Sequence, residues 1–264
     1  MPRFKLLIEY AGTRYSGWQI QKNARTVQGE IDRAIREVSK RRDFELYGSG
    51  RTDAGVHALA QVAHLELYTS LAPELLRRQI NDQLPADIHR RAIDKAPHKF
   101  HARHAAVSRV YLYQISRRRT AFAKPFVWWV RDAVDVSAMR EAALGFLGMK
   151  DFAAFTDDDP EEKSTRVLVE RLEIVEAGAV ILVRVQGSHF LWKMVRRVVG
   201  VLAAVGRGEL RPADAVNLLD DRATLPGGIT PAALTAPAAG LFLERVLYPG
   251  DEPVGEVRPV VWIE

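Results

Sequence analysis

The 264-residue chain contains no cysteine, and this absence removes three kinds of chemistry. It excludes disulfides, thiolate zinc sites and cysteine nucleophiles. The chain also lacks any apolar run near the ~20 residues that a membrane span needs. Its first residues, Met1 to Lys5, carry no apolar signal segment. We therefore expect a cytoplasmic protein that makes no contact with a membrane.

The apolar fraction of 47% and the charged fraction of 27% are those of an ordinary globular protein. The length suffices for two modest domains or for one large α+β body. The formal net charge is +5, which by itself identifies no partner. Its distribution is more informative, because positive charge gathers in three groups while the main acidic run is confined to residues 157–162. The basic groups are Arg33, Arg36, Lys40, Arg41 and Arg42, then Arg117, Arg118 and Arg119, then Lys193, Arg196 and Arg197. Such segregation suits a surface that contacts phosphates, although arginines on solvated faces explain the charge equally well.

Periodicity in the first part of the chain predicts strands and helices in mixed order. Residues 3–10 alternate as a strand, with Phe4, Leu6, Ile8 and Tyr10 on one side. Thr26 is a suitable N-cap for a helix to about Lys40, with one apolar stripe and one basic face. Further elements are expected as strands at 44–47 and 61–67 and as a helix that starts at Pro73.

The rest of the chain continues in the same way. Residues 108–116 alternate as a strand that puts Tyr111 and Tyr113 on one face, and Ser137 can cap a helix to about Leu147. The remaining expected elements are a hairpin of 166–176 and 179–186, a helix at 190–205, a short helix from Pro212 and a strand at 240–248. Because the strict βαβ repeat of a parallel sheet is missing, the pattern indicates an α+β protein with antiparallel sheets.

Residues 48–57 read Gly-Ser-Gly-Arg-Thr-Asp-Ala-Gly-Val-His, and we call them the signature loop. Three glycines let the backbone adopt positive φ, and the loop carries a carboxylate, a guanidinium, two hydroxyls and an imidazole. The residues alone favour a polar turn in which Asp53 caps the next element. A phosphate-binding loop is a weaker alternative, since Gly-x-Gly is not followed by Lys-Ser/Thr.

The signature loop resembles that of the tRNA pseudouridine synthase A family. The resemblance extends along nearly the whole chain. It includes 15–19 with 26–28, 100–103 followed by 111–113, 151–155, 194–196 leading to Gly200, and 236–241. It implies two subdomains, residues 1–105 and 106–264, each an antiparallel sheet backed by helices, with the active cleft between them. It also implies a homodimer that modifies the anticodon arm of tRNA at about positions 38 to 40, where unstacked bases are accessible.

The resemblance assigns Asp53 as the catalytic residue of a reaction that detaches uracil, turns it and rejoins it through C5, with no cofactor and no metal. A carboxylate suits either a nucleophile or a base, and the sequence leaves both open. Burial alone would raise the pKa of Asp53. The resemblance places a cation at Arg196, so we predict an Arg196–Asp53 ion pair. The alternative leaves Arg196 on the solvent face.

The other expected site residues bind the substrate. The resemblance implies that Tyr111 stacks on the target uracil and that Arg51 fills the space that the extruded nucleotide leaves. Arg103 and the three arginines at 117–119 are interpreted as phosphate contacts. His101 and His104 could suggest a metal site, but no carboxylate stands at ligand spacing.

Two other functions compete with the isomerase. A non-catalytic tRNA-binding protein or chaperone on the same fold would not need Asp53. A nucleoside hydrolase would use the carboxylate, but it leaves the distributed arginines unexplained.

Overall fold

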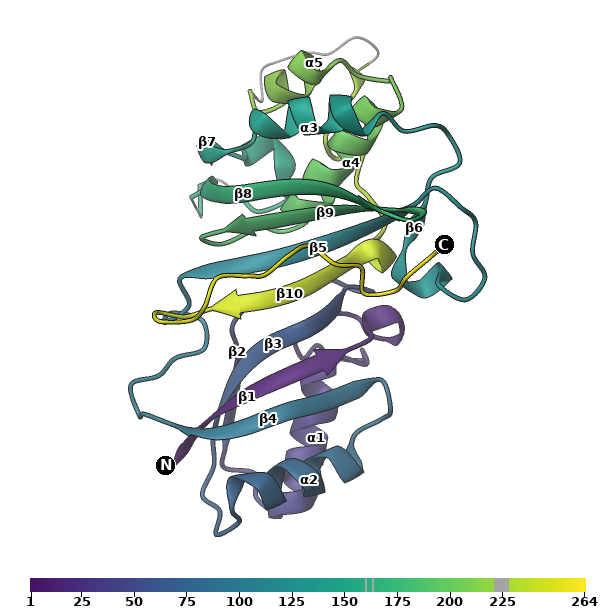
Figure 1. The fold of residues 1–264 in the computed structure, drawn as a ribbon. Helices are drawn as coiled ribbons and strands as arrows, with labels where there is room; N and C mark the ends of the chain where they lie inside the picture. The colour runs from purple at the N-terminus through teal and green to yellow at the C-terminus, as the bar shows by residue number, and fades with distance from the viewer. Residues whose placement is uncertain (160, 163, 221–227) are drawn as a thin grey trace. The chain divides into compact units, whose positions relative to one another are not determined.

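The computed structural model describes residues 1–159, 161–162, 164–220 and 228–264. These residues form ten strands and five α-helices, which confirms the predicted α+β class (Figure 1). The chain divides into two compact units. Unit 1 consists of residues 1–107 and 242–252, and unit 2 consists of residues 108–241 and 253–264. The chain therefore returns to unit 1 near its end, a return that the sequence analysis did not include.

Unit 1 is built on a sheet in the order β4–β1–β3–β10, with β2 beside β3. The strands are β1 (Arg3–Tyr10), β2 (Glu45–Gly48), β3 (His57–Glu66), β4 (Ile88–Ala96) and β10 (Leu241–Leu247). Neighbours pair antiparallel as expected, except that β10 runs parallel to β3, with Phe242 opposite His57. The four alternate residues of β1 that we predicted to share a side are all buried.

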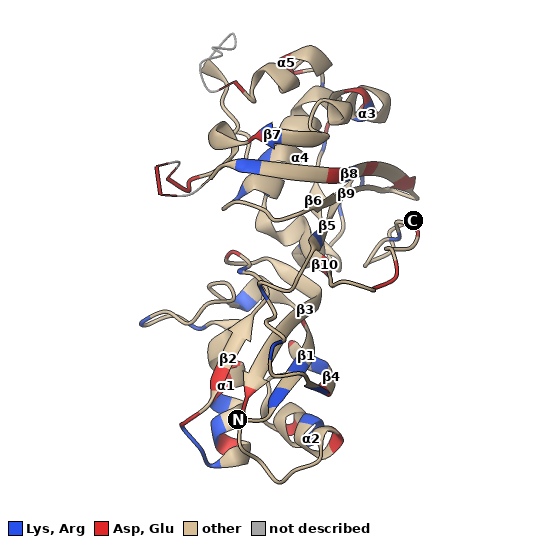
Figure 2. Ribbon diagram, turned by 90° about the vertical axis from the view of Figure 1, so that its left-hand side faces the viewer, with Lys and Arg blue, Asp and Glu red and all other residues tan. Residues whose placement is uncertain are grey.

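Two helices complete unit 1. Helix α1 (Val27–Ser39) begins after Thr26, whose side-chain oxygen accepts a hydrogen bond from Gly29 N at 3.2 Å, so the predicted cap is confirmed. Helix α2 (Pro73–Gln83) begins at Pro73 as predicted and packs against α1 and β4. The basic face expected on α1 is neutralised by the acids of the same helix. The pairs are Glu30 with Arg33, Asp32 with Arg36 and Glu37 with Lys40. Figure 2 shows both signs of charge side by side there.

Two strand predictions in unit 1 were wrong or incomplete. Strand β3 begins at His57 rather than Gln61, so it starts inside the signature loop. Strand β4 was missed because Arg90, Arg91 and neighbouring charges interrupt the apolar alternation. Arg90 is nevertheless buried, since its Nη2 donates to the carbonyl oxygen of Leu76 in α2 at 3.0 Å.

In unit 2, four strands pair antiparallel in the order β5–β9–β8–β7. Its strands are β5 (Ser108–Ser116), β6 (Trp128–Trp129), β7 (Gly148–Asp151), β8 (Arg166–Ala177) and β9 (Val180–Gly187). The predicted hairpin at Ala177–Gly178 joins β8 to β9. The short strands β6 and β7 were not predicted, and β6 runs parallel to β5.

The helices of unit 2 are α3 (Val136–Leu144), α4 (Met194–Gly206) and α5 (Pro212–Asn217). Helix α5 begins at Pro212 as predicted. The cap of α3 is Asp135 rather than Ser137, because the Asp135 carboxylate accepts from two main-chain N–H groups of the first turn. In the described part of the chain, the elements are joined by the single-turn 3-10 helices η1 (Gly12–Arg14), η2 (Lys124–Phe126), η3 (Ala153–Phe155) and η5 (Ala238–Gly240). No helix in the described ranges combines the length and hydropathy of a membrane span.

Helix α4 starts later than predicted, at Met194, and its start is fastened by the acidic run. Asp157 accepts from Lys193 Nζ at 2.6 Å and also pairs with the buried Arg197. Asp158 Oδ2 accepts from the main-chain nitrogen of Trp192 at 2.9 Å. Hydrogen bonds from Lys193 and then Arg197 hold the pKa of Asp157 below its ordinary value of 3.8. The acidic run thus anchors a helix in addition to facing solvent.

We predict that Asp157→Asn lowers the free energy of unfolding by about 2 kcal/mol at pH 7, because Lys193 and the buried Arg197 lose their charged partner. A lowered folded-state pKa contributes stability above the ordinary value, and this contribution is lost as the pH falls through the folded-state value. The deficit should therefore be full at neutral pH and shrink below pH 3.8. Urea unfolding between pH 7 and pH 3, beside Asp132→Asn on an exposed residue, measures it. A deficit of constant size across that range would contradict the assignment.

Candidate active site

The signature loop connects β2 to β3 in unit 1. Its side chains alternate in exposure: Ser49 and Thr52 are buried, Arg51 is exposed and Asp53 is half-buried. The two predicted site residues of this loop are therefore more exposed than Ser49 and Thr52. Of its glycines, Gly55 has a positive φ of 78°, whereas Gly48 and Gly50 do not, which corrects the expectation for those two.

The segment 12–18 packs directly on the backbone of the signature loop. Trp18 N donates to the carbonyl oxygen of Thr52 at 3.0 Å, and Gly55 N donates to that of Tyr15 at 3.2 Å. Gly17 has a φ of 89°, and a Cβ there would lie 2.6 Å from Thr52 O. Only glycine combines that backbone conformation with so close an approach. The motif at 15–19, selected by resemblance alone, is therefore a main-chain support for the residue that precedes Asp53.

The N-terminus of α1 supports the same segment from its other side. Val27 N and Gln28 N donate to the carbonyl oxygens of Gly17 and Trp18 at 3.1 and 3.0 Å. The first N–H groups of a helix have no partner within the helix, so these bonds satisfy them. The Gln28 side chain reaches Leu46 O at 2.9 Å. Helix start, segment 12–18 and signature loop thus form three successive layers joined by main-chain hydrogen bonds.

His57 closes the loop at its far end. The ring is 1% exposed, its Nδ1 accepts from Gly12 N at 3.0 Å, and it stacks on Phe242 of β10 with the centroids 4.7 Å apart. An Nδ1 that accepts a hydrogen bond carries no proton. His57 therefore fixes the loop as a neutral ring.

Arg103 lies on an exposed turn of unit 1 after β4. His101 Nδ1 accepts from the main-chain nitrogens of Arg103 and His104, each at 3.2 Å, which holds the turn. Burial lowers the pKa of His64, whose ring contacts His101, to about 4, and burial also lowers the pKa of His101. Within the described residues, no three ligand-type side chains are placed to hold a metal ion.

Tyr111 and Tyr113 occupy alternate positions on β5 but have different surroundings. Tyr111 is half-buried, and its ring meets the edge of Phe190 at a centroid distance of 5.3 Å. Tyr113 is fully buried and donates to Pro237 O at 2.7 Å, and burial raises its pKa. Tyr113 is therefore a core residue, while Tyr111 keeps the partial exposure that base stacking requires.

Arg196 is clamped to the segment before β10. Its Nε donates to the carbonyl oxygen of Ala236 at 2.7 Å, and Ala236 N donates back to Arg196 O at 3.1 Å. Lys193 and Arg197 instead contact Asp157, so Arg196 stands apart from that basic row. Asp53 belongs to unit 1 and Arg196 to unit 2, and the proposed ion pair between them stays a prediction.

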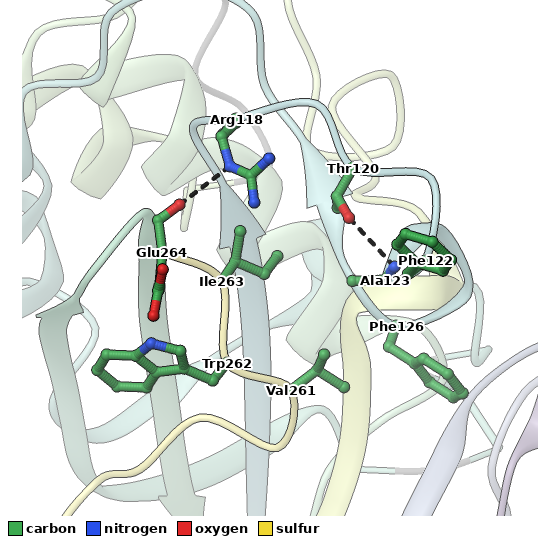
Figure 3. A pocket seen from close by; sticks show the side chains of 9 residues that line it. All are labelled: Arg118, Thr120, Phe122, Ala123, Phe126, Val261, Trp262, Ile263 and Glu264. Atoms are coloured by element: carbon green, nitrogen blue, oxygen red, sulfur yellow. Dashed lines mark hydrogen bonds between the residues drawn. The ribbon is translucent and has the colours of Figure 1, made fainter.

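The three consecutive arginines of unit 2 each have a contact within the chain. Arg117 pairs with Glu176, Arg118 Nε donates to the main-chain oxygen of Glu264 at 3.0 Å, and Arg119 lies over the Trp129 ring. Arg118 lines a cavity of about 460 Å³ formed by residues 118–126 and 261–264 (Figure 3). A second cavity, of about 610 Å³, is formed by residues 133–138 and 205–212. Neither cavity is the candidate site, because neither is lined by Asp53, Arg51, Arg103, Tyr111 or Arg196.

Comparison with known proteins assigns the chain to a family. A family model described as tRNA pseudouridine synthase matches residues 6–104 and 142–249. A tRNA pseudouridine synthase A from Pseudothermotoga lettingae is 36% identical over 251 residues, covering 93% of this chain and 99% of that protein. Proteins of the same name from Paramagnetospirillum magneticum and Rhodopseudomonas palustris are 38% and 39% identical, covering 94% of this chain and 96% and 100% of their own lengths. This chain belongs to the tRNA pseudouridine synthase family.

The matched ranges of the pseudouridine synthase family model include most of the predicted site. Arg51, Asp53, Arg103 and Arg196 fall inside them, whereas Tyr111 lies between the two ranges. Sequence reasoning also missed a set of buried polar residues under the signature loop, the chief of which is Tyr10. Its alternation on β1 is that of an ordinary core residue, and the available signal was its hydroxyl at the end of an otherwise apolar row.

We predict that Gly17→Ala destabilises the fold by about 1–3 kcal/mol, since the new methyl group meets Thr52 O and the positive φ becomes strained. The matched control is Gly50→Ala, because Gly50 lacks a positive φ and a Cβ there meets nothing within 4 Å. Urea unfolding monitored by circular dichroism compares the two. Equal stability of both variants would show that segment 12–18 does not depend on this close approach.

Proposed function

We propose that this chain converts uridine to pseudouridine in the anticodon arm of tRNA, with Asp53 as the catalytic carboxylate. The observation that carries the proposal is the anchored signature loop. This loop carries Arg51 and Asp53, and the residues on either side of them are held by buried hydrogen bonds. The chain also belongs to the tRNA pseudouridine synthase family. Catalytic groups act best on elements whose conformation is fixed before the substrate binds.

The reaction breaks the bond between N1 of uracil and C1′ of ribose, turns the base and forms a bond from C5 to C1′. The C5 proton leaves and N1, freed from the ribose, takes up a proton, so the product is an isomer of the substrate and no other reactant is consumed. Asp53 can act as a nucleophile or as a base that takes a proton from the sugar. Both roles need the ionised carboxylate.

Three residues are proposed to bind the substrate around Asp53. Arg51 occupies the space from which the nucleotide is extruded, since it is the exposed cation of the same loop. Tyr111 stacks on the extruded uracil, and Arg103 contacts a phosphate. The proposal requires residues of both units to reach one nucleotide. A homodimer and a cytoplasmic location, where tRNA is available, belong to the same proposal.

We predict that Asp53→Ala lowers turnover on the order of 10³-fold or more while tRNA still binds, because the reacting carboxylate is removed. Incubation with tRNA labelled with tritium at uracil C5 measures turnover as tritium release, and filter binding measures affinity. Asp82→Ala, at an exposed carboxylate on α2, serves as the matched control.

The same assay separates the competing functions. Tritium release with retention of the base supports the isomerase. Release of free uracil would support a nucleoside hydrolase. Binding without turnover by wild type and variant alike would support a non-catalytic tRNA-binding protein.

We also predict that Arg196→Met lowers kcat about tenfold or more at pH 7 and moves the acid limb of the pH–rate profile to higher pH, because the cation favours the ionised carboxylate. The control is Arg171→Met, an exposed arginine on β8. An unchanged profile would mean that Arg196 is not the partner of Asp53.

A further inference from the structure

A buried polar network lies under the signature loop and starts from Tyr10, the last residue of β1. The Tyr10 hydroxyl oxygen is 2.7 Å from Thr52 Oγ1, and either oxygen can donate. The two residues are 4% and 6% exposed. Burial raises the pKa of Tyr10, so its phenol stays protonated throughout the working pH range. The only hydroxyl on the buried row of β1 is therefore bonded to the residue that precedes Asp53.

Gln61 of β3 extends this network to the start of the loop. Its Oε1 accepts from Ser49 Oγ at 2.7 Å, and its Nε2 donates to the carbonyl oxygen of Gly50 at 3.1 Å. The Gln61 side chain also acts to lower the pKa of the Tyr10 phenol, against the larger effect of burial. Gln61 and Ser49 are 0% and 1% exposed. Buried side-chain hydrogen bonds from Gln61 and Tyr10 thus hold loop residues 49, 50 and 52 from below.

The positions of these bonds place the two predicted site residues of the loop beside residues that are held. Thr52 is held twice, through its hydroxyl by Tyr10 and through its carbonyl oxygen by Trp18 N. Arg51 stands between the held residues 50 and 52, and Asp53 follows the second of them. Because the hydroxyl and the carbonyl oxygen of Thr52 are both held, rotation about the bonds that lead to Asp53 is restricted.

We infer that Tyr10, Thr52 and Gln61 are positioning residues, which set the direction of the Asp53 carboxylate without touching the substrate. This inference rests on the proposed role of Asp53. A buried hydroxyl that only stabilised the core would lower stability when removed and leave turnover unchanged in the folded protein. A positioning hydroxyl lowers kcat, because a displacement near 1 Å of a catalytic group can cost about 10²-fold in rate.

The test compares Tyr10→Phe with Tyr248→Phe. Tyr248 also has a buried hydroxyl with a 2.7 Å hydrogen bond, to Ala102 O, but it lies outside the network. We expect Tyr10→Phe to lower kcat for tritium release by about 10- to 100-fold with KM changed less than about twofold. Tyr248→Phe should keep the kcat of the wild type. All measurements are made at a temperature at which circular dichroism shows each variant to be folded.

Thr52 supplies a second and independent comparison. Thr52→Ser keeps the hydroxyl and should retain most of kcat, whereas Thr52→Val keeps the shape without the hydroxyl and should lower kcat as Tyr10→Phe does. If Tyr10 acts through Thr52, the double variant Tyr10→Phe with Thr52→Val is no slower than the slower single variant. Independent effects that multiply in the double variant would overturn the inference.

Asp53→Ala, measured in the same series, separates this inference from the proposed function. If Asp53→Ala retains turnover, the proposed site is wrong and the positioning role fails with it. If Asp53→Ala is inactive while Tyr10→Phe has the kcat of the wild type, the site stands and the positioning role alone is overturned. An equal loss of kcat in Tyr10→Phe and Tyr248→Phe would likewise overturn it, since the effect would not be specific to the network.

Discussion

The candidate site depends on the direct contact between two irregular backbones, segment 12–18 and the signature loop. Apart from the short η1 and the two ends of the signature loop, neither segment has a sheet ladder or a helix to satisfy its main-chain groups, and polar groups without partners are costly when buried. Each segment instead supplies partners to the other, as in the bonds from Trp18 to Thr52 and from Gly55 to Tyr15. The start of α1 completes the arrangement, because its first N–H groups bond the far side of segment 12–18. These hydrogen bonds fix the backbone conformation of the signature loop, although most of the loop is neither helix nor strand.

In unit 2, close main-chain contacts between two separate segments likewise surround Arg196. A Cβ on Gly200 of α4 would lie 1.7 Å from Leu234 O. The backbone at Leu234 can therefore pack this closely on α4 only because residue 200 is a glycine. Two residues further along, Ala236 exchanges hydrogen bonds with the main chain and the guanidinium of Arg196. In both units, a polar side chain of interest is oriented by main-chain contacts between segments far apart in the sequence. Such contacts are short and directional, and they tolerate little change in backbone conformation.

The fold could be predicted where local signals agree, and the predictions failed where tertiary contacts overrode them. Helix α1 has a capping threonine and a continuous apolar stripe, and helix α2 has a proline at its first turn, so both were placed correctly. Strand β4 carries a buried arginine whose partners are helix carbonyl oxygens, which no local pattern indicates. The site shows the same limit. Asp53 and Arg51 stand out by composition and resemblance, whereas Tyr10 and Thr52 are 42 positions apart and become partners only in the folded chain.

Unit 1 is built from two separate stretches of the chain, residues 1–107 and residues 242–252, and the second stretch contains most of the parallel strand β10. Strand β3, which begins inside the signature loop, is paired along its first residues by Phe242 and Leu243, and Phe242 also stacks on His57. A ribosome synthesises the chain from the N-terminus and delivers residues 242–252 only after all of residues 108–241. During synthesis, the strand that begins inside the signature loop therefore has an open edge until residues 108–241 and β10 have been made. The loop acquires this neighbour only when β10 has been made, so a nascent chain stopped before β10 contains every residue of the loop but not the complete unit that holds it.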